Sequence, residues 1–167
     1  MLNTLRFNLL LSLILATSGC GFQLKGDQSF EKSILNGAEV AIISAAPRSE
    51  LTSALRQQLT LAGVEITTSG SGVLTVKLSG EQFTQRNLSL TAQARAAEIE
   101  LTLSAVFSAH QDQQERIIAT QVQAVRRMLN DPRNIVGKTE EMRLFHEEMR
   151  RDLAIQIVRR LDNRLAD

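Results

Sequence analysis

Polar and apolar residues alternate through the middle of the chain, and this period of two predicts strands with one buried face. The longest alternation runs from Ala97 to Phe107, and a shorter one covers Leu74 to Leu78. A third run, Ile117 to Met128, alternates less regularly. An earlier apolar run, Val40 to Ile43, is typical of a buried strand. The pattern therefore predicts four strands.

Two other segments show the period of a helix. The first follows Pro47, carries apolar residues at helical spacing and stops before Gly63, a residue common just past helix ends. The second covers about Thr139 to Leu165, with glutamates in its first half and arginines in its second, which complements the helix dipole. We expect its apolar stripe to pack in the core. That stripe consists of Met142, Phe145, Met149, Leu153, Ile157 and Leu161.

The segments between these elements set the connections. Val64 to Ser71 is a turn-rich link, and the polar stretch His110 to Arg116 predicts a hairpin. Thr84 to Arg95 is either a strand extension or a mobile loop. Asn130-Asp131-Pro132 ends the sheet, because proline cannot donate into a ladder. The order β-α-β-β-β-α predicts an α+β fold, a two-layer sandwich with a mixed four-stranded sheet and both helices on one face.

Residues 1–19 have the pattern of a secretory signal peptide. A single positive side chain, Arg6, precedes the apolar run Phe7 to Ala16, which is too short to span a bilayer, and small residues follow. Cys20 is the only cysteine, so it cannot form an internal disulfide. Its place after Ser-Gly resembles the bacterial lipobox, in which the thiol takes a diacylglycerol and the new amino terminus is acylated, commonly with palmitate.

Lipidation would divide the chain into three parts: the signal peptide, a lipidated tether over residues 20–36 and a single domain over residues 37–167. Several acyl chains on Cys20 would anchor the protein stably, whereas one chain anchors only marginally. Gly21 follows the cysteine. By resemblance to enterobacterial sorting signals, the absence of aspartate there favours the periplasmic face of the outer membrane.

The charge balance argues against a polyanion-binding protein. Arg6 is the only charged residue before Cys20, so the net charge of +1 falls to zero in the mature chain. There is no Trp or Tyr for stacking on bases, and nucleic acid is not an expected partner. His110 and His146 belong to no metal-binding spacing, and no phosphate loop or nucleophile elbow occurs. We therefore expect no enzymatic activity, no cofactor and no metal.

Basic residues are the most suggestive polar feature. Arg86 and Arg95 bracket the polar segment before the longest strand, Arg126-Arg127 end the last strand, and Arg133 and Lys138 follow it. If the strands pair as predicted, several of these side chains gather near one end of the sheet, where they suit a phosphate-bearing ligand. The alternative is that they are dispersed surface charges.

Several segments resemble the LptE family of lipopolysaccharide (LPS)-assembly lipoproteins. Cys20 to Gly26 (CGFQLKG) resembles that family's CGFxLRG opening, with Lys25 in place of arginine. Asn130-Asp131-Pro132 is similar to its Asp-Asn-Pro turn, with the first two residues exchanged. Glu147 to Leu153 and Arg160-Leu161 resemble its C-terminal helix. Together with the lipobox and the element order, the similarity covers most of the mature chain.

The resemblance implies a specific role. Members of the family plug the LptD outer-membrane barrel in a 1:1 complex, assist its assembly and bind LPS during its delivery to the cell surface. A lysine six residues after the turn proline is linked to LPS binding in the family, and Lys138 holds that position after Pro132. An arginine before the third strand is the other such residue; Arg86 is the preferred match, and Arg95 remains an alternative.

Two other classes of protein stay open. The first is a lipoprotein subunit of another envelope machine, such as phospholipid traffic or barrel insertion, which a different stable complex would reveal. The second is a lipid-anchored periplasmic hydrolase, which would show turnover that depends on His146 or on a carboxylate.

Overall fold

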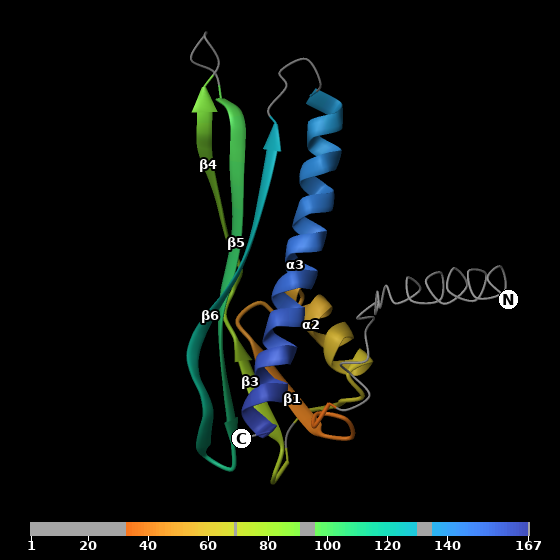
Figure 1. The fold of residues 1–167 in the computed structure, drawn as a ribbon. Helices are drawn as coiled ribbons and strands as arrows, with labels where there is room; N and C mark the ends of the chain where they lie inside the picture. The colour runs from red at the N-terminus through yellow and green to blue at the C-terminus, as the bar shows by residue number, and fades with distance from the viewer. Residues whose placement is uncertain (1–32, 69, 91–95, 130–134, 167) are drawn as a thin grey trace, which may run out of the picture.

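A long, curved sheet and two helices make up the domain (Figure 1). The computed structural model describes residues 33–68, 70–90, 96–129 and 135–166 of the 167-residue chain. The elements described are β1 (Glu39–Ser44), α2 (Glu50–Leu61), β2 (Glu65–Thr67), β3 (Leu74–Leu78), β4 (Gln82–Leu90), β5 (Ala96–Gln111), β6 (Gln114–Leu129) and α3 (Ile135–Ala166).

The sheet is built around β5. Its two antiparallel neighbours on one side are β3 and β4, which follow one another along it, and β6 pairs with its other side. β1 lies parallel to both β3 and β2, so the sheet is mixed. The predicted α+β class and mixed sheet are confirmed. The prediction of four strands is wrong, because β2 and β4 join the sheet of the described residues to make six strands.

The two strands that the prediction omitted, β2 and β4, show no clear alternation of polar and apolar residues in the sequence, for physical reasons. β2 is only three residues long, too short for a period to show. From Gln82 to Asn87, β4 is exposed on both faces, so nothing forces an apolar residue at every second position. Of the two interpretations of the segment from Thr84 onward, the strand extension is confirmed as far as Leu90.

The core lies on one face of the sheet. Register places Leu78 opposite Phe107 and Leu103 opposite Ala124, and these side chains are all buried. They form a single apolar cluster with residues of both helices, including Leu55. Every second residue of β5 from Ile99 to Ala109 belongs to it, which confirms the predicted alternation.

Helix α2 begins and ends where the sequence predicts. The Ser49 hydroxyl accepts a hydrogen bond from the amide of Thr52, 3.2 Å away, and caps the first turn. At the other end the amide of Val64 donates to the carbonyl of Leu59, and Gly63 has a φ of +81°. This closing turn is a Schellman motif, whose left-handed residue is usually glycine because a Cβ is disfavoured there.

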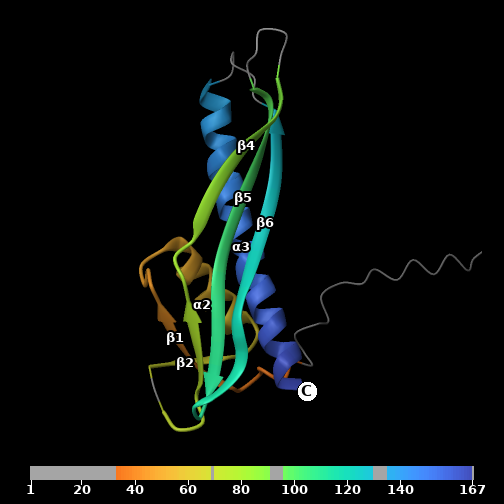
Figure 2. The same ribbon diagram turned by 90° about the vertical axis from the view of Figure 1, so that its left-hand side faces the viewer.

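Helix α3 starts four residues earlier than the predicted Thr139, at Ile135, and runs about 48 Å along the sheet (Figure 2). Its predicted stripe is confirmed: Met149, Leu153, Ile157 and Leu161 are fully buried. Met142 and Phe145, nearer its start, pack partly buried against the same cluster.

A two-residue turn at Asp112 and Gln113 joins β5 to β6, which confirms the predicted hairpin. Both residues have positive φ, 48° and 66°, as a type I′ turn requires. The Asp112 carboxylate also accepts a hydrogen bond from the amide of Gly72 at 2.8 Å, which fixes the neighbouring loop.

The outer edge of β6 is covered by side chains. On the far side of β5, the carbonyl of Val106 accepts from the Ser79 amide and the amide of Val106 donates to the Ser79 hydroxyl. Its partner Gln121 must therefore direct its own backbone groups away from β5. The outward carbonyls recur at every second residue of β6, and each of three in succession accepts a side-chain hydrogen bond. The pairs are Arg160 to Gln121 (3.0 Å), Gln156 to Gln123 (2.9 Å) and Arg126 to Val125 (3.0 Å).

Candidate functional site

Arg86 lies on the sheet face turned away from the core. It sits on β4 directly opposite Glu100 of β5, and its guanidinium donates to that carboxylate at 2.9 Å. Arg127 of β6 approaches the other carboxylate oxygen of Glu100 at 3.4 Å. Glu100 stands between Ile99 and Leu101 in β5, both buried in the core, so this trio must face the opposite side. Two of the predicted basic residues are thus gathered around one carboxylate.

Lys138 occupies the first turns of α3, one turn before Met142 of the buried stripe. Its side chain is half-buried. The start of α3 and the last residues of β6 lie at the same end of the molecule (Figure 1). Lys138 and Arg86 therefore belong to the same end but to different layers: Lys138 to the helix side and Arg86 to the open face of the sheet.

The remaining predicted site residues cannot be compared with the structure. Cys20, Arg95, Arg133 and the Asn130-Asp131-Pro132 turn lie outside the described residues. Arg126, which the sequence groups with its neighbour Arg127, faces the helix layer instead. Strand alternation separates two adjacent arginines onto opposite faces of the sheet.

Arg126 and Arg150 hold the long helix to the sheet. Arg126 pairs with Asp152 of α3 at 2.5 Å, and this hydrogen bond raises the pKa of its guanidinium. Arg150 of α3 donates to both carboxylate oxygens of Glu81, at 2.7 and 2.9 Å, and also pairs with Glu50 at the start of α2. The Glu81 hydrogen bond is the main reason that the pKa of Arg150 is raised. The sequence shows these charges but not the partners, because each pair spans distant segments.

The described residues hold no cluster suited to metal binding. No group of three His, Cys, Asp or Glu side chains in the ranges described comes close enough to bind a metal ion. His146 instead packs edge-on against Phe83 of β4, with ring centroids 4.3 Å apart. Within the same residues, none of the helices has the length and hydropathy to cross a membrane.

These features define a class: an α+β domain with ion pairs on its surface and a single apolar core. Comparison with known proteins gives the family. The model of the family LptE, described as lipopolysaccharide-assembly, matches residues 38–161. The chain belongs to the LptE family.

Individual relatives agree with this assignment. The LPS-assembly lipoprotein LptE of Yersinia pestis (strain Pestoides F) is 29% identical over 160 residues, which is 92% of this chain and 73% of the relative. The crystal structure of the rare lipoprotein B from Shewanella oneidensis superposes with a TM-score of 0.68 at 28% identity, over 74% of this chain and 92% of that one. A minor lipoprotein from Acinetobacter baumannii, at 19% identity, shares the fold, with a TM-score of 0.64 over 77% of this chain and 93% of that one.

Proposed function

We propose that this protein is an outer-membrane lipoprotein that binds LPS during its delivery to the cell surface and plugs and helps to assemble the LptD barrel in a 1:1 complex. The family match over residues 38–161 is the observation that carries the proposal. In it, residues 1–19 are a cleaved signal peptide, Cys20 carries the lipids that hold the protein on the periplasmic side, and residues 20–36 tether the domain of residues 37–167.

The side chains on the sheet face turned away from the core support the proposed role as a barrel plug. We infer a two-layer arrangement in which both helices cover one face and leave the other for a partner. Register assigns to that second face the hydroxyl and amide side chains of Thr75, Thr84, Thr102, Ser104, Ser108, Gln121 and Gln123. The same face carries the charged Lys77, Arg86, Glu100 and Arg127 and the partly exposed Val106 and Val125. Such a surface suits the water-filled lumen of a barrel, whose inward side chains are polar.

We infer that LPS phosphates meet the end of the domain that carries Lys138 and Arg86, with Arg95 as the alternative to Arg86. Arg86 is mostly exposed, and Glu100 positions its guanidinium without enclosing it. Several N–H groups of that guanidinium remain available to a phosphate, which accepts charge-assisted hydrogen bonds.

Affinity purification of the tagged, acylated protein from detergent-solubilised outer membranes tests the proposal. Mass spectrometry is expected to find an LPS-exporting barrel in a 1:1 ratio, and Cys20→Ala is expected to remain folded but lose its membrane attachment. Recovery of a different barrel or complex would instead indicate a subunit of another envelope machine.

Lys138→Asp tests the LPS site. It is expected to weaken LPS binding by about tenfold, because a lost charge-assisted contact and a new repulsion are together worth more than about 1.4 kcal/mol. Arg151→Asp is the matched control: the residue is exposed on the same helix and undergoes the same change of charge. Equal affinities for the two variants would remove Lys138 from the site.

A further inference from the structure

The end of the domain opposite Lys138 is where the described chain begins. The carboxylate of Asp162, near the end of α3, accepts hydrogen bonds from the Ser33 hydroxyl and the Ile34 amide, both at 2.8 Å. Leu35 is fully buried in the core. The chain therefore enters the domain beside the last turns of α3. We call this end of the molecule the tether end, because Cys20 lies only 13 residues before Ser33 in the sequence.

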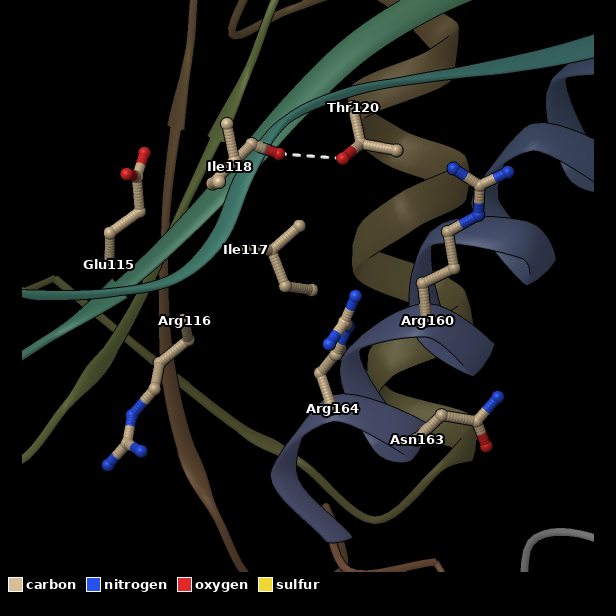
Figure 3. Close-up of a pocket in the computed structure, with 8 residues that line it drawn as sticks. All are labelled: Glu115, Arg116, Ile117, Ile118, Thr120, Arg160, Asn163 and Arg164. Carbon is tan, nitrogen blue, oxygen red and sulfur yellow. Dashed lines mark hydrogen bonds between the residues drawn. The ribbon is translucent and has the colours of Figure 1, made fainter. Parts of the chain in front are cut away.

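A cavity of about 590 Å³ opens at the tether end, between the first residues of β6 and the last turns of α3 (Figure 3). Two arginines one turn apart, Arg160 and Arg164, project from α3 toward β6, and Arg116 projects from β6 in a different direction. Glu115 is the only carboxylate among the lining residues. Two guanidinium groups directed toward the cavity, with a single carboxylate among all its lining residues, make it favourable for an anion.

These arginines differ from several others in the domain. Arg86, Arg127 and Arg150 are each held by a carboxylate. Within the residues described, Arg116, Arg160 and Arg164 form no ion pair. One N–H of Arg160 donates to the Gln121 carbonyl and fixes the guanidinium in place. The other N–H donors of this guanidinium remain available.

An exposed apolar side chain also lines the cavity. Ile118 is 72% exposed, a large fraction for an isoleucine. An exposed aliphatic group at a basic cavity matches a ligand that carries a phosphate on an apolar body rather than a free phosphate.

We propose that this cavity binds the phosphate group of an anionic glycerophospholipid in the leaflet that holds the protein's own anchor. The anchor rests on the proposed function; the charge, the exposed Ile118 and the position at the tether end are properties of the structure. Arg160 and Arg164 would hold the phosphate from α3, while Ile118 contacts the glycerol and the start of the acyl chains. The contact would orient the domain relative to the membrane by adding a second attachment point to that of the anchor.

A lipid titration of the purified, acylated protein in a non-ionic detergent tests this site. The side-chain Nε–Hε signals of the arginines are followed by NMR while dihexanoyl phosphatidylglycerol is added. Parallel titrations use dihexanoyl phosphatidylcholine, inorganic phosphate and lipid A. The Arg160 and Arg164 signals are expected to shift saturably with phosphatidylglycerol, at least about tenfold more tightly than with the zwitterionic lipid or with free phosphate.

Arg164→Gln is expected to weaken phosphatidylglycerol binding by about tenfold, the effect of one charge-assisted contact. Arg159→Gln is the matched control, an exposed arginine of the same helix that does not line the cavity, and it should bind like the parent. Equal loss in both variants would overturn the proposal in favour of general charge attraction. Equal binding of inorganic phosphate, or binding of lipid A alone, would overturn it as well. The titration needs no barrel, so its result is independent of the purification that tests LPS assembly.

Discussion

Arg150 joins three elements, and its removal should reveal how much the domain depends on that junction. Its side chain is only 17% exposed and donates to both oxygens of Glu81, which is 24% exposed. Glu50, its second partner, is 71% exposed. Arg150 thus links α3 to the segment before β4 and to the first residue of α2.

The burial of the paired side chains determines how much unfolding free energy the removal of Arg150 is expected to cost. Exposed ion pairs contribute about 0–1 kcal/mol, whereas removing one partner of a buried pair costs about 3–5 kcal/mol. The Arg150–Glu81 pair lies between these limits, so Arg150→Met should lower the free energy of unfolding by about 2 kcal/mol. Glu50→Gln should cost no more than about 0.5 kcal/mol, because water screens that carboxylate.

Urea unfolding followed by circular dichroism, with the chain from residue 21 onward, measures these differences. A double-mutant cycle of Arg150→Met and Glu81→Gln should give a coupling of about 1–2 kcal/mol, typical of residues in one ion-pair network. A coupling below about 0.5 kcal/mol would refute the reasoning. So would a cost for Glu50→Gln as large as that for Glu81→Gln, since exposure would then not govern the strength of the pair.

Three further outcomes are expected. Leu101→Asp should lower the unfolding free energy by more than about 4 kcal/mol, because an unpaired charge would enter a fully buried site; a native-like melting temperature would contradict the register of β5. Gln113→Gly should stabilise the chain by about 0.5 kcal/mol in thermal unfolding, since φ at this residue is +66°. Arg143 donates to Glu140 at 2.6 Å and lowers the pKa of that carboxyl. Stability from this pair is present above the unfolded pKa and is lost as pH falls through the lowered folded pKa. Carboxyl NMR should show Glu140 titrating below 4.5, and Arg143→Gln should raise its pKa again.

Elements with one buried face were predictable from the sequence. β5 alternates because each second side chain, such as Ile99 or Phe107, packs in the core while the next faces away. The stripe of α3 is equally visible, since the helix buries one side along most of its length. β4 could be placed only by its pairing with β5, because a strand exposed on both faces carries no such constraint.

The sequence predicts less about the candidate sites than about the fold. The sequence marks Arg86 and Arg127 as basic residues near strands, but only the register of three strands reveals that they share Glu100. The cavity at the tether end was not predicted, because it combines residues of β6 with residues of α3 that lie 40 or more positions away. Arg160 and Arg164 belong to the helix arginines that complement the dipole, a local explanation that the sequence alone could not extend to a site.

The side chains that cover the outer edge of β6 matter if the domain lies within a β-barrel, as the proposed function has it, because they block strand pairing. An open strand edge pairs readily with another strand, and the wall of a barrel under assembly offers many. Arg160, Gln156 and Arg126 occupy three successive carbonyls where a foreign strand would have to bond. Under the proposed function, the domain would therefore accompany strands as they close into a barrel without being incorporated as one of them.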